Sequence, residues 1–175
     1  CYAIGCAFSS GSSVAKRNPE LAHQFFLQAA EAGHPAAMTS YAYNCERLND
    51  YKDTREAVEW LKKGARAENT SAMISLAFRY RDGDLEQSYE KAEHWFKAAY
   101  SKGEKICAYH LGKLYEFHIK DYEKAYEWYQ LMIGHRSRDF RQLAWFLNRE
   151  DTNYYDPAES LRLKIEHLDV TIDVS

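Results

Sequence analysis

The sequence contains little glycine and proline, with 8 and 3 among 175 residues. This is about half of the usual combined share of roughly 12 %. The scarcity excludes a collagen-like or Gly/Ser low-complexity chain and disfavours an all-β protein, whose many turns need these residues. No run of 18 apolar residues occurs, so no segment is predicted to span a membrane. With 46 % hydrophobic residues, the chain is too apolar to be disordered.

Motifs of catalysis and metal binding are also lacking. The seven histidines form no H-E-x-x-H and no paired Cys/His spacing, and there is neither a P-loop nor a G-x-G-x-x-G. The serine-rich stretch 9–13 contains no G-x-S-x-G and is expected to be a loop. Several glutamates lie at predicted helix starts, where the helix dipole favours them: Glu90, Glu93, Glu123 and Glu127. We therefore expect no catalytic residue, no metal and no cofactor, and the chain is predicted not to be an enzyme.

Cysteine is scarce as well, and four cysteines are too few for a disulfide framework in a chain of this length. They fall at unrelated positions of the repeat described below, so no bridge would recur from unit to unit. We expect them to be buried thiols that pack as small hydrophobic groups: Cys1, Cys6, Cys45 and Cys107.

An excess of positive charge is absent too. Residues 1–150 carry 21 basic and 20 acidic side chains, whereas residues 151–175 carry 2 basic and 6 acidic ones. A near-neutral body with an acidic tail argues against nucleic-acid binding, which depends on neutralising many phosphates. Nucleic acid is therefore not an expected partner.

What the sequence does contain is an internal repeat. Alanines recur at intervals of 35, 35 and 33 residues, and each is followed by large residues at offsets three and four and by a further marker at offset seven. The four sets are Ala22, Phe25, Phe26 and Ala29; Ala57, Trp60, Leu61 and Gly64; Ala92, Trp95, Phe96 and Ala99; and Ala125, Trp128, Tyr129 and Met132. These offsets lie on one face of an α-helix, so each set predicts a helix that packs closely on a neighbour.

A second helix is expected to follow in each of the first three units. Its markers are a small residue, an apolar residue four positions later and another small residue directly after it: Ala37, Tyr41 and Ala42; Ala72, Leu76 and Ala77; and Cys107, Leu111 and Gly112. Gly33 and Gly103 lie in the turns between the paired helices, as helix C-termini prefer, and Asn69 is expected to take the left-handed conformation in the second unit. Stacked helix pairs of this kind predict an α-solenoid.

These residues resemble the Sel-one-like repeat family, a relative of the tetratricopeptide repeats. The family pattern is A-x-x-W-Y-x-x-A-A-x-x-G, followed by A and then by L-G-x-x-Y. The third unit matches it closely, with Ala92, Trp95, Phe96, Ala99, Gly103 and the run Leu111-Gly112-Lys113-Leu114-Tyr115. The resemblance implies an all-α fold, a right-handed α-solenoid of about four helix-pair repeats with a C-terminal capping helix.

The pattern divides the chain into three parts. Residues 1–13 are expected to be the end of a truncated preceding repeat and a loop. Residues 14–150 form the repeat array, with units near 18–54, 55–88, 89–121 and 122–150. Residues 151–175 are expected to form a capping helix, which starts at Asp156 with a proline and a glutamate in its first turn, and an acidic tail.

The candidate site is a surface. If the helix with L-G-x-x-Y corresponds to the first tetratricopeptide helix, it lines the concave side of the superhelix, and positions two before and two after the Leu would face the groove. Each such pair contains an aromatic residue, and charges alternate one turn further along. The predicted partner-binding residues are Tyr43, Glu46, Phe78, Arg81, Tyr109, Lys113, Glu116, Phe146 and Arg149. The alternative is that a tight superhelix buries these rings between units.

The resemblance implies a non-catalytic scaffold that binds a protein or peptide on its concave face, because family members act mainly as adaptors and assembly factors. Adaptor, regulator and toxin-neutralising immunity protein all stay open, as do bacterial cytoplasm and periplasm. The alternative function is a regulatory or accessory segment of an enzyme or envelope assembly whose catalytic part lies outside this chain. Self-association through an apolar N-terminal edge at Tyr2, Ile4 and Phe8 is a further alternative.

Overall fold

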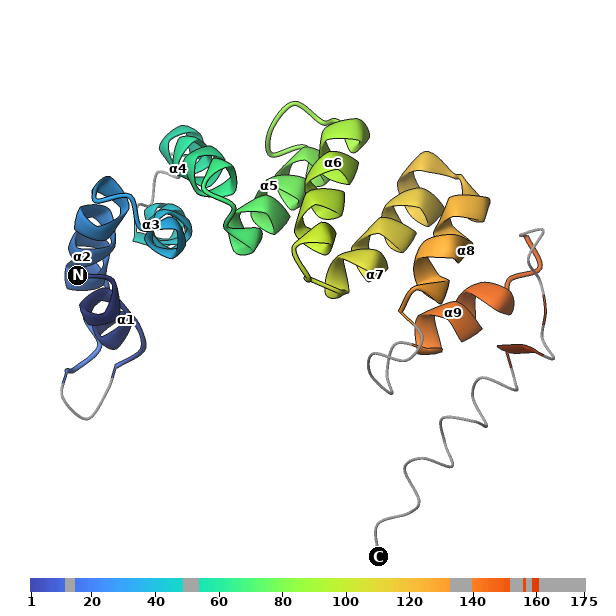
Figure 1. The fold of residues 1–175 in the computed structure, drawn as a ribbon, viewed down its shortest axis with the longest axis horizontal. Helices are drawn as coiled ribbons and strands as arrows, with labels where there is room; N and C mark the ends of the chain where they lie inside the picture. Colours follow the sequence, from blue (N-terminus) through green and yellow to red (C-terminus); the bar gives the residue numbers. More distant parts are fainter. Residues whose placement is uncertain (12–14, 49–53, 133–139, 152–155, 157–158, 161–175) are drawn as a thin grey trace, which may run out of the picture. The chain divides into compact units, whose positions relative to one another are not determined.

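A computed structural model describes residues 1–11, 15–48, 54–132, 140–151, 156 and 159–160, except for the side chains of 46–48, 54 and 140–142. Every element in this described part is helical, so the predicted all-α fold class is confirmed (Figure 1). The elements are α1 (Tyr2–Ser10), α2 (Pro19–Glu31), α3 (Pro35–Leu48), α4 (Thr54–Arg66), α5 (Thr70–Asp82), α6 (Tyr89–Ser101), α7 (Ile106–Lys113), the π-helix η1 (Leu114–Ile119), α8 (Tyr122–Gln130) and α9 (Phe140–Leu147).

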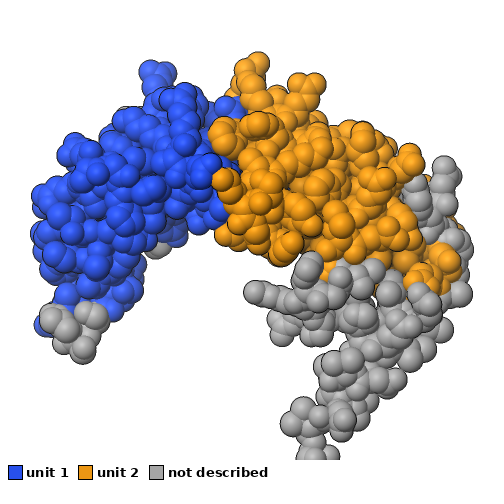
Figure 2. Space-filling view, viewed as in Figure 1, with its two compact units in different colours: residues 1–85 blue, residues 86–175 orange. Residues whose placement is uncertain are grey.

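The chain forms two compact units, residues 1–85 and residues 86–175 (Figure 2). In unit 1, each helix from α1 to α5 packs against the next one along the chain. In unit 2, α6 packs on α7, α7 on α8 and α8 on α9. Packing between successive helices is how a solenoid builds its core, since no single helix pair can bury its apolar face alone.

The helix starts follow from local capping residues. Asn18, Asn69, Ser88 and Asp121 each precede a helix, and each side chain accepts a hydrogen bond from the backbone N–H three residues later. These bonds satisfy N–H groups that have no partner within the helix itself. The predicted cap at Asp156 is also present, because its carboxylate accepts from the Glu159 N–H at 2.9 Å. The remainder of the predicted capping helix and the acidic tail lie outside the described residues.

The repeated small residues form the centre of the helix packing. The alanines that open the four sets are all 0 % exposed: Ala22, Ala57, Ala92 and Ala125. The residues four positions later are buried as well: Phe26, Leu61, Phe96 and Tyr129. The aromatic residues at offset three are only half-buried: Phe25, Trp60, Trp95 and Trp128. The residue four positions after each alanine therefore supplies the large buried side chain of the repeat. The residue three positions after it lies at the edge of the packed face.

The turns between paired helices differ from the prediction at one position. Gly33 and Gly103 have φ values of 85° and 100°, as expected for a left-handed helix end. In the second unit the left-handed residue is Glu68, at φ 60°, and not Asn69. Asn69 is instead extended and caps α5 through the Ala72 N–H at 3.0 Å. The prediction for Asn69 is therefore wrong because its side chain serves the next helix.

The cysteines divide into two groups. Cys45 and Cys107 are buried, as expected, and burial raises the pKa of the Cys107 thiol to about 12. Cys1 is exposed and Cys6 is half-buried, so the expectation of burial is wrong for these two. Cys1 directly precedes α1 and Cys6 lies on it, and the buried surface of this helix centres on Gly5 against the ring of Phe26.

The apolar N-terminal edge is mostly covered within unit 1. The Tyr2 ring stacks on His34 with a centroid distance of 4.4 Å, and Phe8 stacks on Phe25 at 5.8 Å. Of the edge residues expected to be exposed, Ile4 alone has a large exposed fraction, 46 %. Self-association through this edge stays a prediction, with a smaller apolar surface than the sequence indicated.

One packed histidine makes the stability of unit 1 depend on pH. His23 of α2 stacks on the Tyr41 ring with a centroid distance of 4.5 Å, and its buried Nδ1 has no hydrogen-bond partner among the described residues. Burial lowers the pKa of His23 below its ordinary value of 6.5, although the Glu56 carboxylate opposes this. The folded chain therefore binds this proton less readily than the unfolded chain does.

We expect unit 1 to lose stability as the pH falls from 6.5 toward the lowered pKa of His23. Above pH 6.5 the contribution is fully present, because both states then hold a neutral imidazole. Urea unfolding at pH 5, 6 and 7.5 should show a weaker pH dependence for His23→Gln than for the wild type. His94→Gln, at an exposed position, is the control. Equal slopes for His23→Gln and the wild type would contradict this assignment.

Candidate functional site

A row of aromatic and cationic side chains lies on the surface of unit 2. We call it the aromatic–cation strip and define it as Tyr109, Lys113, Phe117, Trp145 and Arg149. Lys113 Nζ lies 5.5 Å from the centroid of the Tyr109 ring and 5.7 Å from that of Phe117. The Phe117 and Trp145 rings lie 6.0 Å apart, and the Arg149 guanidinium is 5.3 Å from the Trp145 ring. Each cation of the strip thus lies beside an aromatic ring at a distance typical of cation–π contact, and the Phe117 and Trp145 rings lie next to each other between the two cations.

The helix geometry brings the first three members into line. Tyr109 and Lys113 lie four residues apart on α7 and therefore share a face. Beyond Lys113 the chain continues as η1, whose wider π-helical turns change the residue period. In η1 the side chains of Leu114, Tyr115 and Glu116 are buried, whereas Phe117 is 37 % exposed. The π-helix thus extends the exposed row while it turns the intervening residues inward.

The fourth member comes from α9. This helix buries Leu143, Ala144, Phe146 and Leu147, which leaves Trp145 exposed at 47 %. A half-exposed tryptophan next to a phenylalanine is an unusual surface for a water-exposed helix, because both rings bury large apolar areas when they can. The pair Phe117 and Trp145 is therefore the apolar centre of the strip.

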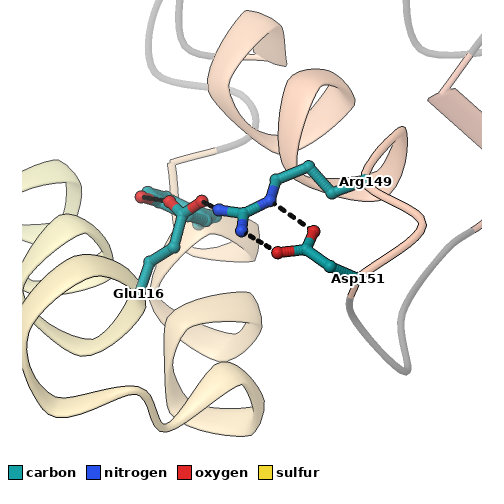
Figure 3. A network of polar contacts seen from close by, with 4 residues as sticks. Glu116, Arg149 and Asp151 are labelled. Carbon is teal, nitrogen blue, oxygen red and sulfur yellow. Dashed lines mark hydrogen bonds and ion pairs between the residues drawn. The ribbon is translucent and has the colours of Figure 1, made fainter.

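Arg149 is held in place by a network of polar contacts (Figure 3). Its Nη1 donates to Glu116 Oε1 at 2.5 Å, and its Nε donates to Asp151 Oδ1 at 2.8 Å. A further hydrogen bond joins Arg149 Nη2 to Asp151 Oδ2. The Asp151 hydrogen bonds, followed by Glu116, raise the pKa of Arg149 above its ordinary value, and Arg149 lowers that of Asp151. The guanidinium is thereby fixed in one orientation beside the Trp145 ring.

Glu116 is the buried end of this network. Its side chain is 0 % exposed, and its second oxygen, Oε2, accepts a hydrogen bond from the Tyr129 hydroxyl at 2.7 Å. A buried carboxylate is tolerable only when it is paired and hydrogen-bonded, and here both oxygens are satisfied. The Glu116 side chain links η1 to α8 and to the end of α9.

Two members of the predicted site are therefore corrected. Glu116 was expected on the surface but is fully buried by its contacts with Arg149 and Tyr129. Phe146 is also 0 % exposed and packs on the ring of Tyr129 with a centroid distance of 5.6 Å. In the last helix pair the alternative prediction, that the ring belongs to the core, is thus the correct one for Phe146.

The remaining predicted residues lie in unit 1, and two of them, Phe78 and Arg81, contact each other. Tyr43 is exposed at 56 % on α3. On α5, the Arg81 guanidinium lies 4.8 Å from the Phe78 ring, and it pairs with Asp82 at 2.6 Å. The side chain of Glu46 lies outside the described residues.

Sequence reasoning missed Phe117 and Trp145. A signal for Phe117 was present, because it follows Lys113 by four residues and so continues the row from Tyr109. Trp145 could have been found from α9 itself, where the buried residues on either side leave one position facing away. Both are large aromatic residues at exposed positions. An alignment of repeats selects residues that recur from unit to unit, so it does not identify such positions.

No group of three His, Cys, Asp or Glu side chains in the described part of the chain is arranged to hold a metal ion. None of the described helices combines the length and the apolarity needed to cross a bilayer.

Comparisons with known proteins give a consistent family and fold. The Sel1 repeat model matches residues 1–34, 35–69, 70–104 and 106–133. Each of the first three matched segments holds two successive helices, and the fourth holds α7, η1 and α8. The matched segments are therefore shifted by one helix from the predicted units. Among curated protein sequences, none matches this chain.

Solved structures share the architecture. A Sel1 repeat protein from Oxalobacter formigenes aligns at 19 % identity and a TM-score of 0.80 over 97 % of this chain and 71 % of its own. The protein c5321, a protective antigen of uropathogenic Escherichia coli with an SLR fold, aligns at 22 % identity and a TM-score of 0.81. The alignment covers 97 % of this chain and 37 % of c5321. The immunity protein Pa5087 from Pseudomonas aeruginosa aligns at 20 % identity and a TM-score of 0.50. The alignment covers 98 % of this chain and 81 % of Pa5087. At these identities the likeness is one of fold: an all-α, tetratricopeptide-like solenoid.

Proposed function

The chain belongs to the Sel1 repeat family, and from this premise we propose that it is a non-catalytic scaffold that binds a protein or peptide partner through the aromatic–cation strip. Sel1 repeats generally mediate protein–protein interaction. Function nevertheless depends on a particular surface and not on the fold. The strip is the observation that supports this assignment.

The composition of the strip suits a binding surface. Tryptophan, tyrosine and arginine are the residues that contribute most to binding energy at protein interfaces, and here they occur together in one row. The Arg149 side chain is already held by Asp151 and Glu116, so little of its rotamer entropy remains to be lost on binding. The exposed rings of Phe117 and Trp145 would gain the burial that they lack in the free chain.

Lys113 favours a partner with an acidic group beside apolar ones. Its Nζ lies 5.5 Å from the centroid of the Tyr109 ring, where a carboxylate of the partner could pair with the ammonium while its apolar neighbours cover the ring. Arg149 already pairs with Glu116 and Asp151, so it contributes a fixed guanidinium beside Trp145 and not an unpaired charge. Tyr43, Phe78, Arg81 and Glu46 of unit 1 remain proposed contact residues as well.

Adaptor, regulator and toxin-neutralising protein are all compatible with this proposal. The toxin-neutralising role is retained because an immunity protein is among the structures with this fold. At 20 % identity that likeness concerns the fold, and it does not carry over a partner.

The proposal is tested by capture of partners from a lysate of the source cells. We expect the variant Tyr109→Ala/Phe117→Ala/Trp145→Ala to retain at least about tenfold less partner than the wild type, because interface aromatic residues each contribute a large share of the affinity. The matched control is Ile4→Ala/Leu131→Ala, which removes exposed apolar side chains outside the strip. Circular dichroism verifies folding of both variants. If the control lowers capture as much as the strip variant does, the strip is not the contact surface.

A further inference from the structure

Unit 1 contains a pocket of about 460 Å³, to which every helix from α1 to α5 contributes. This volume is within the usual range for ligand pockets. Phe26 and Leu61, both 3 % exposed, give it apolar walls. Asn44, Ser75 and Arg79 place polar groups in its lining. A pocket that combines apolar walls with a few polar groups has the usual composition of a binding site.

The hydrogen-bonding groups of the pocket are complementary to a peptide. The Ser75 hydroxyl donates to the Ser71 carbonyl at 2.9 Å, so its oxygen can accept a hydrogen bond from a ligand N–H. Asn44 is only 7 % exposed, and its side-chain Nδ2 has no hydrogen-bond partner among the described residues. The Asn44 side chain thus adds to the polar lining of the pocket, and its buried Nδ2 is a donor that a ligand could reach only after the side chain rotates.

Arg79 is the one charged side chain among the described residues that line the pocket. Arg79 has contacts of its own within the chain, and burial lowers its pKa from the ordinary value, an effect that the Asp84 carboxylate opposes. The described residues that line the pocket include no aspartate and no glutamate. A cation that is partly removed from water, in a lining without carboxylates, favours an anionic ligand group.

We propose that this pocket receives one acidic residue of a peptide segment of the partner, whose carboxylate pairs with Arg79 while an adjacent apolar side chain packs on Phe26 and Leu61. This inference rests on the proposed scaffold function and specifies the chemistry that unit 1 recognises. The carboxylate supplies the acceptor for Arg79, and the peptide backbone supplies N–H groups for the hydroxyl oxygens. Lys113 of the strip favours the same acidic type of partner.

The test uses two capped tripeptides that differ only in charge, acetyl-Leu-Glu-Leu-amide and acetyl-Leu-Gln-Leu-amide. In a ¹H–¹⁵N NMR titration of the whole chain, we expect the Glu peptide to shift the side-chain signals of Asn44 and Arg79 and to bind at least tenfold more tightly than the Gln peptide. Arg79→Gln should abolish this discrimination, whereas Arg79→Lys should retain it. Arg66→Gln removes the same charge from an exposed position of α4 and should leave the discrimination unchanged.

Cys6 provides an independent readout because its thiol side chain lines the pocket. In a Cys1→Ser background, the Glu peptide should slow the alkylation of Cys6 by iodoacetamide in proportion to occupancy, and the Gln peptide should not. Equal binding of both peptides, or equal effects of Arg79→Gln and Arg66→Gln, would overturn the proposal. Succinate that binds as tightly as the Glu peptide would also overturn it, because the occupant would then be a small carboxylate.

Failure of this inference is distinguishable from failure of the proposed function. If the Glu and Gln peptides bind equally while the strip variant still loses its partner, the scaffold function stands and the pocket has no part in recognition. If the strip variant keeps its partner, the strip assignment fails, whatever the peptides do.

Discussion

Replacement of Arg149 by methionine is expected to lower the free energy of unfolding of unit 2 by about 3 kcal/mol, the low end of the cost of breaking a buried ion pair. The reason lies with Glu116, which is 0 % exposed and pairs with Arg149 Nη1 at 2.5 Å. Without Arg149, the carboxylate would keep its hydrogen bond from the Tyr129 hydroxyl but would lose the positive charge beside it. Arg149 itself is 21 % exposed, so water can compensate in part, which is why the low end is chosen.

Urea unfolding followed by tryptophan fluorescence measures this effect, since Trp95, Trp128 and Trp145 all lie in unit 2. The double variant Glu116→Gln/Arg149→Met should recover much of the loss, because it leaves no buried charge without a partner. Asp151→Asn should have a much smaller effect, because Asp151 is exposed and remains hydrated. If the double variant is as unstable as Arg149→Met, the loss comes from packing of the arginine stem and not from the buried charge.

The repeat pattern alone predicted the core of each helix pair well. Small residues that recur at a fixed offset must face another helix, because only a short side chain allows close approach there. Ala22, Ala57, Ala92 and Ala125 are accordingly all fully buried. Helices are local structures with a fixed period, so their buried faces can be inferred from spacing without knowledge of the fold.

Three members of the strip, Tyr109, Lys113 and Arg149, were among the residues predicted from the repeats. Tyr109 and Lys113 share a face of α7, as their spacing of four requires. Beyond Lys113 the period changes in the π-helix η1, so an extrapolation at α-helical spacing placed Glu116 on the surface. Phe117, which the structure places in the strip, lies four residues after Lys113, so the spacing itself indicated a position that the alignment of repeats did not select.

Contacts between distant segments were beyond the reach of the pattern. The fate of Glu116 depends on Tyr129 and Arg149, which are 13 and 33 residues away. Phe146 is buried because three tyrosines of α8 lie against it: Tyr122, Tyr126 and Tyr129. Alignment of repeats assigns each position the same role in every unit, yet the last pair has different neighbours from the first.

The pocket of unit 1 was not predicted for a related reason. Its polar lining includes Asn44, Ser75 and Arg79, which come from two helices and have no common spacing. Each of them alone is an ordinary polar residue on a helix. Their significance depends on the arrangement of α3 against α5, which only the folded chain shows.

Replacement of Gly112 by alanine is the second substitution expected to have a large effect. A Cβ atom at this position would lie 2.3 Å from Cε1 and 2.5 Å from Cδ1 of the Tyr129 ring. The ring is 0 % exposed, and its hydroxyl is bonded to the buried Glu116 carboxylate. It therefore cannot withdraw without disturbing that hydrogen bond. We expect a loss of about 2 kcal/mol in unit 2, in the middle of the range for overpacked cores.

Gly64→Ala is the matched control for this substitution. Gly64 is also a buried helical glycine, but the nearest atom to an added Cβ there is Ala72 Cβ at 3.1 Å, which requires a shift of only a few tenths of an ångström. Alanine gains about 0.5–1 kcal/mol over glycine inside a helix, and this gain should offset most of the strain at Gly64. At Gly112 the same gain is too small to offset the overlap with the ring.

Urea unfolding should therefore give a clearly lower free energy of unfolding for Gly112→Ala than for Gly64→Ala. Equal free energies would mean that α7 and α8 can move apart at little cost. A loss confined to Gly112→Ala would show that the glycine of the L-G pair sets the distance between these helices, and with it the position of the Glu116 carboxylate that holds Arg149.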